Sequence, residues 1–282
     1  MLIFYRQIDL KDHLKSISAP KISIGFVPTM GALHQGHLTL MQQSLKHNDF
    51  TVMSIFVNPT QFNNSEDLVK YPRTLDRDIE KIKSVSEQII VYAPSVEDIY
   101  NGKTVSQSFD FQGLEHQMEG RHRPGHFDGV GTVVKRLFEI VNPTNAYFGE
   151  KDFQQLQIVK KLVEILKMPV NIVGIPIFRT ASGLAMSSRN ERLSTAERES
   201  ATMIYKILCQ AKIQFGTKSA SQVSDWVKKS FDRQSDFRLE YFEIADEATL
   251  LPCIRKSKFK KYRAFIAVFV NEVRLIDTIS LN

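Results

Sequence analysis

Hydrophobic positions in the first two-thirds of the chain alternate between short continuous runs and runs with helical spacing. The continuous runs predict strands at residues 22–27, 51–57, 88–92, 146–148 and 170–177. The helically spaced runs predict helices at residues 38–46, 74–85, 129–141 and 153–166. Strands that alternate with helices predict an α/β fold, in which a Rossmann-like, doubly wound parallel sheet carries helices on both faces.

The last third of the chain follows a different pattern. Helical runs come first, at 195–213 and 221–231, and strand-like runs follow at 238–244, 264–270 and 272–276. Ser194, with Glu197 three residues later, is the signature of a capping box at the start of the first helix. Helices followed by strands predict a small α+β domain. We therefore expect two domains, residues 1–176 and residues 177–282.

Composition narrows the class of protein. The chain has 282 residues, of which 43% are hydrophobic and 24% charged, as in ordinary globular proteins. Its two cysteines, Cys209 and Cys253, exclude a disulfide framework and a thiolate zinc site, and they suggest free thiols in a reducing cytoplasm. No apolar run approaches the ~20 residues of a membrane helix, and the N-terminus has no signal-peptide pattern. We expect a cytoplasmic protein without a membrane partner.

The net charge of +6 is unevenly placed. The first 176 residues hold 19 basic and 19 acidic side chains, so the whole excess lies in the last third, much of it in residues 255–263, RKSKFKKYR. A basic run with two interleaved aromatic residues is compatible with RNA binding. A solvated turn between two strands explains it more simply, and we do not expect a nucleic acid partner.

The strongest chemical signal directly follows the first predicted strand, in residues 28–38, PTMGALHQGHL. His34 and His37 are three residues apart with Gly36 between them, which puts both rings on one side of the opening turn of a helix. Backbone N–H groups at a helix start attract phosphate oxygens, and α/β sheets bind ligands at the carboxyl ends of their strands. Two alternatives are a histidine pair packed under a loop and a two-histidine zinc site, which lacks an obvious third ligand.

Four further segments carry weaker signals. Residues 149–152 carry Lys151, which suits phosphate, or form a helix start with an acidic first turn. Residues 186–190 carry two hydroxyl groups and an arginine, which suit phosphates, or form an ordinary turn rich in Ser and Thr. Residues 56–62, with Tyr71 beyond, offer uncharged polar groups at a strand end, or form a proline-stopped turn. The basic segment 121–129 suits a mobile lid that meets anions, or a solvated loop in which Asp128 caps the next helix.

Together these segments resemble one family, the pantothenate synthetases or pantoate–β-alanine ligases, within the HxGH nucleotidylyltransferase superfamily. The matching stretches are PTMGALHQGHL (28–38), FVNPTQF (56–62), YPRT (71–74), RPGHFDGV (123–130), YFGEKDFQQL (147–156), GLAMSSRN (183–190) and VRLIDT (273–278). The resemblance implies a two-step reaction. Pantoate's carboxylate attacks the α-phosphate of ATP to give pantoyl adenylate and pyrophosphate, and β-alanine's amine then displaces AMP to give pantothenate.

The resemblance also implies roles for individual residues. Those that would bind ATP are Pro28, Thr29, Met30, Gly31, Ala32, Leu33, His34, Gln35, Gly36, His37, Gly149, Glu150, Lys151, Asp152, Phe178, Met186, Ser187, Ser188 and Arg189. Those with a catalytic role toward the phosphates would be His34, His37, Lys151, Ser187, Ser188 and Arg189, with His37 as the proton donor. Asp152 would bind the ribose, and Phe178 would contact adenine through its backbone.

For the other two substrates, the resemblance implies that Gln61 and Gln155 hold pantoate's hydroxyl groups. Asn58, Tyr71, Arg123 and His126 would lie near pantoate or β-alanine. Mg²⁺ would accompany ATP without a dedicated protein site, and the chain would form a homodimer. A different nucleotidylyltransferase, acting on a phosphorylated metabolite, shares the histidine motif but leaves the Gln61 and Gln155 pair unexplained.

Overall fold

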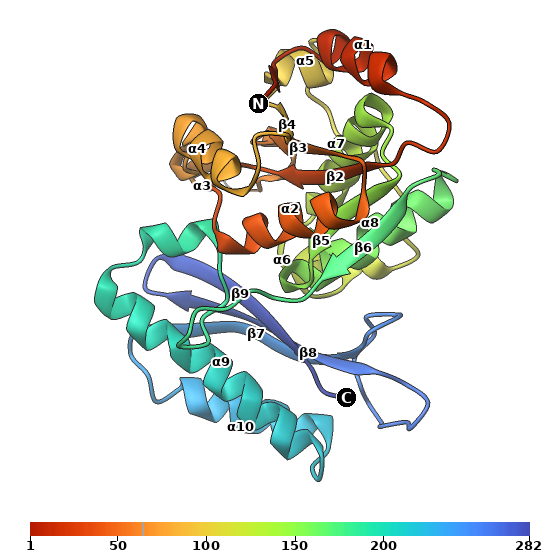
Figure 1. Cartoon of the computed structure of the whole chain (residues 1–282). Helices are drawn as coiled ribbons and strands as arrows, with labels where there is room; N and C mark the ends of the chain where they lie inside the picture. The colour runs from red at the N-terminus through yellow and green to blue at the C-terminus, as the bar shows by residue number, and fades with distance from the viewer. Residues whose placement is uncertain (64) are drawn as a thin grey trace. The chain divides into compact units, whose positions relative to one another are not determined.

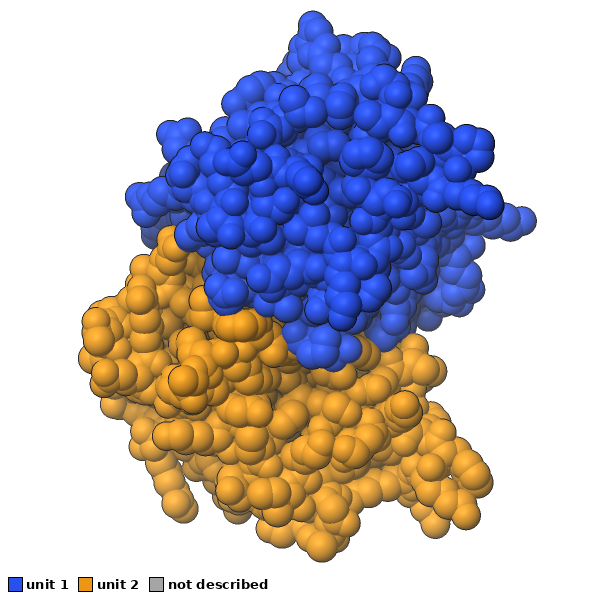
Figure 2. Space-filling model, viewed as in Figure 1, with its two compact units in different colours: residues 1–115, 120–150, 155–176 blue, residues 116–119, 151–154, 177–282 orange. Residues whose placement is uncertain are grey.

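The computed structural model describes residues 1–63 and 65–282. The chain divides into two compact units, coloured separately in Figure 2. The first unit comprises Met1–Glu115, Gly120–Glu150 and Gln155–Pro176. The second comprises His116–Glu119, Lys151–Gln154 and Ile177–Asn282, so two short segments from the first 176 residues belong to it.

The first unit is built on a six-stranded sheet in which every neighbouring pair of strands is parallel (Figure 1). Its strand order is β1-β4-β3-β2-β5-β6. The strands are β1 (Ile3–Phe4), β2 (Ile24–Thr29), β3 (Phe50–Ile55), β4 (Ile90–Tyr92), β5 (Asn145–Gly149) and β6 (Asn171–Ile175). The expected α/β, Rossmann-like class is therefore confirmed.

Helices connect these strands, as parallel pairing requires. They are α1 (Gln7–Ile17), α2 (Gln35–His47), α3 (Ser65–Lys70), α4 (Leu75–Val85), α5 (Val96–Tyr100), α6 (Met118–His122), α7 (His126–Val141) and α8 (Phe153–Ile165). Short 3₁₀ turns are η1 (Pro59–Gln61), η2 (Leu114–His116) and η3 (Glu150–Asp152). Leu40 and Met41 of α2 and Ile82 of α4 pack with Val27 and Met53 of the sheet in one buried cluster.

Several details of the first unit differ from the sequence predictions. The first long strand does not stop before Pro28 but continues through it to Thr29. Beyond Phe26 this strand is paired with β3 alone, so the nitrogen of Pro28 needs no hydrogen-bond partner on the β5 side.

The basic segment 121–129 was expected as a loop, and that expectation is wrong for most of it. Residues 118–122 are helical, and α7 begins at His126 with Gly125 as its N-cap, at φ +78°. Asp128 therefore lies inside the helix and does not cap it. Its carboxylate instead accepts a hydrogen bond from the backbone N–H of Phe109 at 3.0 Å.

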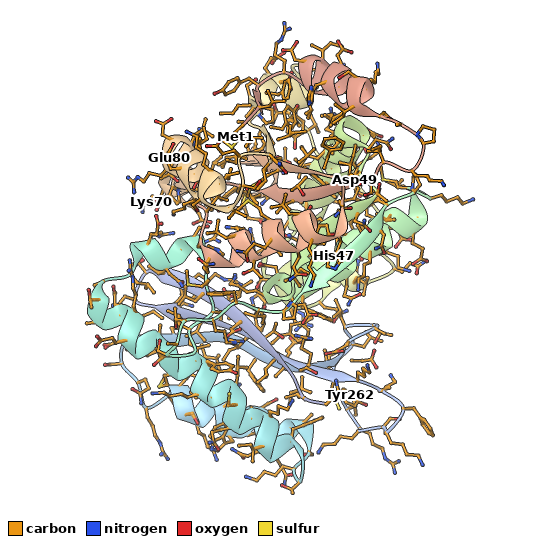
Figure 3. The ribbon with its side chains drawn as sticks, in the orientation of Figure 1. Met1, His47, Asp49, Lys70, Glu80 and Tyr262 are labelled. Carbon is orange, nitrogen blue, oxygen red and sulfur yellow. The ribbon has the colours of Figure 1, made fainter. Side chains whose placement is uncertain are left out.

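The turn from α2 into β3 is held by a short polar contact. His47, labelled in Figure 3, is the last residue of α2, and Asp49 follows it just before β3. The Asp49 carboxylate accepts hydrogen bonds from the hydroxyl and the backbone N–H of Ser23, at 2.7 and 2.8 Å. These hydrogen bonds lower the pKa of Asp49 below its ordinary value. The contact fixes the start of β2 beside the start of β3.

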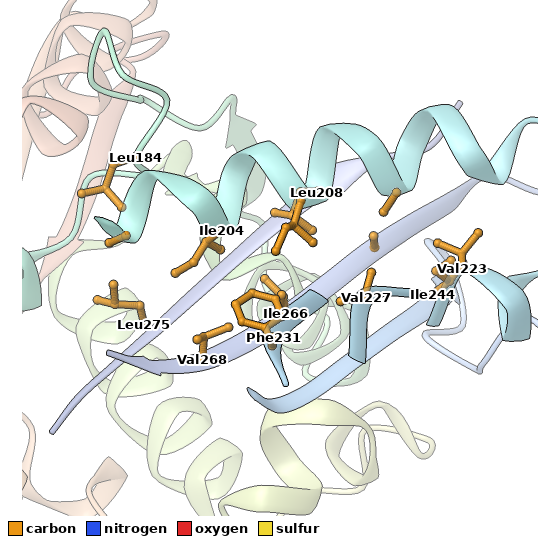
Figure 4. Packing of buried hydrophobic residues seen from close by; sticks show 14 of the residues in the cluster. Leu184, Ile204, Leu208, Val223, Val227, Phe231, Ile244, Ile266, Val268 and Leu275 are labelled. Atoms are coloured by element: carbon orange, nitrogen blue, oxygen red, sulfur yellow. The ribbon is translucent and has the colours of Figure 1, made fainter. Parts of the chain in front are cut away.

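The second unit contains an antiparallel sheet in the order β7-β8-β9, with two long helices packed on it (Figure 4). Its elements are η4 (Ser188–Arg192), α9 (Thr195–Phe215), α10 (Ala220–Phe231), β7 (Phe237–Asp246), β8 (Tyr262–Val270) and β9 (Val273–Ser280). Ile204 and Leu208 of α9 pack with Val227 of α10 and Ile266 of β8 in its core. The predicted capping box is confirmed, since Glu197 N–H donates to Ser194 Oγ and Ser194 N–H donates to Glu197 Oε2.

The basic run 255–263 lies mainly in the connection between β7 and β8, as a turn between two strands was expected to do. Several of its charges have partners within the unit. The Lys256 ammonium lies over the Phe215 ring, 4.1 Å from its centroid, and Lys260 is 3.5 Å from Asp246. Arg263 is buried in β8 and paired with Glu247 at 3.0 Å, so it is not solvated. These contacts favour a structural role for the run.

Cys209 and Cys253 are free and partly buried. Within the described residues, no helix is both long and apolar enough to span a membrane.

Candidate active site

Three of the segments singled out in the sequence follow neighbouring parallel strands of the first unit. Residues 30–37 follow β2, residues 56–62 follow β3, and Gly149 ends β5, which pairs with β2. Because these neighbouring strands are parallel, their carboxyl ends lie at the same edge of the sheet. Chain order reverses between β2 and β5, since β3 and β4 lie to one side and β6 to the other. This edge is the topological switch point, where α/β sheets bind ligands.

The loop between β2 and α2 is held by a buried carboxylate. Gly31 and Ala32 both have left-handed backbone conformations, at φ +80° and +48°. Asp78 of α4 is 0% exposed, and its two oxygens accept the backbone N–H groups of Ala32 at 2.9 Å and Leu33 at 2.7 Å. Lys81 donates to the carbonyl of Leu33 at 2.6 Å. A left-handed alanine is strained, so these contacts compensate for a shape that the loop does not prefer by itself.

This loop places two histidine rings side by side at the start of α2. His34 is the N-cap residue and His37 lies in the first turn. Their rings stack, with centroids 4.0 Å apart and planes inclined by 24°. The backbone N–H of His34 donates to Nδ1 of His37 at 3.3 Å. Because Nδ1 accepts this bond, the proton of the neutral His37 ring is on Nε2, which can then donate to a ligand.

A polar cluster follows β3 and is centred on Gln61, in η1. The Gln61 side-chain amide contacts Met30 Sδ at 2.9 Å, and its Oε1 accepts from Asn58 Nδ2 at 3.2 Å. Asn58 is 1% exposed, and its Oδ1 accepts the Tyr100 hydroxyl at 2.6 Å. Burial raises the pKa of Tyr100, although its hydrogen bonds and Arg136 oppose this, so the hydroxyl stays protonated and donates. Gln61 is therefore oriented by groups that are themselves buried.

Two basic residues at the start of α7, Arg123 just before it and His126 as its first residue, join the same cluster. Arg123 Nη2 donates to the backbone carbonyl of Gln61 at 3.1 Å, and His126 Nδ1 lies 2.8 Å from the same oxygen. Gly129 lies under η1, where an added Cβ would stand 2.3 Å from the carbonyl oxygen of Thr60. The structure thus brings Met30, Gln61, Arg123 and His126 together, although they come from three separate parts of the chain.

The remaining predicted residues of the first unit have fewer described contacts. Tyr71 is buried, and its ring meets Phe62 edge-on at 5.6 Å between centroids. Gln155 lies on α8 and is partly buried. Thr29 donates its hydroxyl to the Ser54 carbonyl at 2.7 Å, which closes the end of β2 against β3.

The second unit carries the other predicted nucleotide residues. Lys151 and Asp152 form an ion pair at 3.6 Å in η3. Phe178 and Met186 lie at the base of a small hairpin, where the N–H of Met186 donates to the Phe178 carbonyl at 3.0 Å. Ser187 is the N-cap of η4 and its hydroxyl accepts the Arg189 N–H. Ser188 begins η4 and is buried.

Comparison with known proteins identifies the family of this chain. A family model described as pantoate-beta-alanine ligase matches residues 3–280. The chain belongs to the pantoate–beta-alanine ligase family. The pantothenate synthetase of Flavobacterium psychrophilum is 68% identical over 281 residues, covering 100% of both chains. The chain is accordingly a ligase that forms an amide bond.

Solved structures agree with this family across the whole chain. A crystal structure of pantothenate synthetase from Thermus thermophilus matches with a TM-score of 0.89 and 38% identity, over 100% of this chain and 99% of that one. A pantoate-beta-alanine ligase structure from Francisella tularensis, complexed with beta-gamma ATP and beta-alanine, matches with a TM-score of 0.81 and 34% identity. That match covers 100% of this chain and 98% of the other.

Sequence reasoning missed the residues that hold the ligase's histidine loop. Asp78 and Ile82 are the buried positions of α4, so the carboxylate occupies the apolar face of an otherwise polar helix. A charged residue at a buried helical position needs partners. An aspartate on the apolar face of a predicted helix was therefore the signal in the sequence that Asp78 has a structural role. The partners themselves, the N–H groups of Ala32 and Leu33, lie more than forty positions away and have no sequence signature.

The described part of the chain contains no group of three or more His, Cys, Asp or Glu side chains arranged to hold a metal ion.

Proposed function

We propose how residues of this chain carry out the family's reaction, the ATP-dependent condensation of (R)-pantoate with β-alanine to pantothenate, AMP and pyrophosphate. In the first step a carboxylate oxygen of pantoate forms a bond to the α-phosphorus of ATP, and the bond to pyrophosphate breaks. In the second step the amine of β-alanine forms the amide bond, loses a proton, and AMP leaves with the electron pair. Neither step requires a nucleophile from the protein.

The observation that carries this proposal is the stacked histidine pair at the switch-point edge of the sheet. His37 Nε2–H and the first N–H groups of α2 are donors for phosphate oxygens. Negative charge grows on these oxygens as the α-phosphorus becomes five-coordinate. Donors that are already oriented stabilise this charge without reorganisation, which is the largest contribution in many enzymes. His37 would act through this Nε2–H as a hydrogen-bond donor, since a neutral imidazole does not give up its proton, and His34 would support it by stacking.

Other charged and hydroxyl groups would act on the rest of the nucleotide. Lys151 and Arg189 would neutralise phosphate charge, and Ser187 and Ser188 would donate hydroxyl hydrogen bonds. Asp152, whose side chain is 47% exposed, would accept from a ribose hydroxyl. Phe178 would contact adenine through its backbone. Mg²⁺ would arrive with ATP and reduce the charge of its phosphates.

We assign pantoate to the Gln61 cluster, because the side-chain amide of Gln61 offers both a donor and an acceptor to hydroxyl groups. Gln155 would serve a second hydroxyl. Asn58 is too deeply buried to contact a substrate directly, and we propose that it orients Gln61. Arg123 and His126 brace the Gln61 carbonyl, and together with Tyr71 they would lie near pantoate or β-alanine.

The test is pyrophosphate release from ATP and Mg²⁺ with pantoate alone, with β-alanine alone and with both. Release that needs only pantoate, followed by AMP and pantothenate once β-alanine is added, is the expected result. A simple carboxylic acid without hydroxyl groups is the matched control and should not replace pantoate. Failure of folded, ATP-binding protein to respond to pantoate would favour a nucleotidylyltransferase with a phosphorylated acceptor.

We further propose that the protein is a cytoplasmic homodimer. Light scattering coupled to size-exclusion chromatography would give twice the chain mass of 32.3 kDa if it is a dimer. A mass of one chain at micromolar concentration would contradict this.

A further inference from the structure

The hairpin that leads into Ser187–Arg189 is a separate small device in the second unit. Arg179 and Ala185 pair as an antiparallel bridge, and the N–H of Thr180 donates to the Leu184 carbonyl at 2.9 Å. Gly183 closes its turn at φ +94°. Because Met186 follows the bridge directly, the position of this hairpin sets where the next three residues begin.

The hairpin is fastened by a bidentate ion pair to the last strand. Arg179 donates from Nη1 to Asp277 Oδ2 at 2.7 Å and from Nη2 to Asp277 Oδ1 at 2.9 Å. The same guanidinium donates to the backbone carbonyls of Gly183 and Thr278, each at 3.1 Å. One planar side chain therefore joins both ends of the hairpin to β9. Lysine has no such fork of donors.

Apolar packing holds the same hairpin from another side. The Tyr205 ring on α9 lies against Arg179, with the guanidinium carbon 3.8 Å from the ring centroid. At Gly183 an added Cβ would stand 2.4 Å from Cδ1 of the same ring. Leu184 is part of the buried core and is labelled in Figure 4. Asn190 donates to the Ala185 carbonyl at 3.0 Å, which ties η4 back to the hairpin.

Asp277 is the electrostatic centre of this arrangement. Its side chain is 5% exposed, and burial raises its pKa, while the Arg179 hydrogen bonds and charge, the Thr278 N–H and the Lys151 charge oppose this. A buried ion pair contributes little net stability compared with apolar side chains of similar size. What it supplies is a defined geometry, because the carboxylate accepts the arginine fork in one orientation.

We propose that Arg179 and Asp277 are positioning residues for the adenylation step, which keep Ser187–Arg189 in place to receive the ATP phosphates. This proposal rests on the proposed function and adds a role for the C-terminal motif VRLIDT, which contains Asp277. Neither residue needs to touch a substrate. Their effect passes through the backbone of the hairpin to the two serine hydroxyls and the Arg189 guanidinium.

The test uses Asp277→Asn and Arg179→Lys in the full-length enzyme. Both should lower kcat/KM for ATP by about 10- to 100-fold in pantoate-dependent pyrophosphate release, because small misplacements of binding groups are costly. The KM for pantoate should stay within a factor of two. The double variant should be hardly worse than either single variant, because both remove one interaction.

Two matched controls come from the same unit. Asp246→Asn alters another buried carboxylate, which orders the turn after β7, and Arg238→Lys alters another arginine that lies over an aromatic ring. Neither should change KM for ATP. If Asp277→Asn and Arg179→Lys lower only the melting temperature, as the controls would, the positioning role is wrong. If Asp277→Asn does not fold, the ATP kinetics of Arg179→Lys decide. Wild-type enzyme that releases no pyrophosphate would instead contradict the proposed function.

Discussion

The contact between Asp78 and the histidine loop leads to a prediction whose size follows from its hydrogen bonds. Asp78→Asn keeps the shape of the side chain but replaces one acceptor oxygen with an NH₂ group. The N–H of Ala32 or of Leu33, now at 2.9 and 2.7 Å from the carboxylate, then faces another donor. The other bond loses its charge.

Hydrogen bonds to a charged group contribute about 1.5–3 kcal/mol each, and a buried donor without an acceptor costs about 1–3 kcal/mol. We therefore expect Asp78→Asn to lower the free energy of unfolding by roughly 2–3 kcal/mol. The left-handed Ala32 would relax once its N–H is released, and the histidine rings would move with the loop. A displacement of about 1 Å at catalytic groups costs about 10²-fold in rate, so adenylation should slow by that order.

Urea unfolding measures the first effect, and single-turnover pyrophosphate release with saturating ATP and pantoate measures the second. Asp76→Asn is the control, since Asp76 lies in the same first turn of α4 but is exposed. Both substitutions remove the same charge near the helix start, worth about 0.3–1 kcal/mol, so their difference isolates the loop contact. The reasoning is refuted if the two variants unfold alike and release pyrophosphate at the same rate.

Four further predictions test other parts of the molecule. His37→Ala should slow adenylation by roughly 10²–10³-fold with little change in melting temperature; an unchanged rate would remove its catalytic role. Gln61→Ala should raise the Michaelis constant for pantoate and leave that for ATP nearly unchanged, as steady-state kinetics would show. Gly25→Ala should cost about 1–3 kcal/mol in urea unfolding, because its Cβ would stand 2.1 Å from the Ser44 hydroxyl. For Asp246, burial raises the pKa, but hydrogen bonds from Thr249 and Ala248 and the charge of Lys260 outweigh it and leave the pKa below its ordinary 3.8. The stability advantage over Asp246→Asn should therefore be complete above about pH 5 and shrink as the pH falls below that. A constant difference in urea unfolding across this pH range would show another origin.

The sequence alone determined the features that have local causes. Alternating strand and helix patterns were enough for the α/β class, and the Ser194–Glu197 capping box marked the start of α9 correctly. The histidine motif marked the junction of β2 and α2 to within a few residues, because a helix start after a parallel strand is itself a local feature. The family motifs named the reaction for the same reason, since each is a short contiguous stretch.

Tertiary structure decided which distant groups meet. Pro28 is tolerated inside β2 only because pairing with β5 has already ended at that point. Residues 121–122 end α6 and residues 126–129 begin α7, where Gly129 lies so close to Thr60 of η1 that only glycine fits. Asp78 with Ala32, and Arg179 with Asp277, are joined across 46 and 98 positions. Such pairs depend on the register and packing of whole elements, which no short stretch of sequence encodes, whereas caps and strand ends depend on neighbours within a few residues.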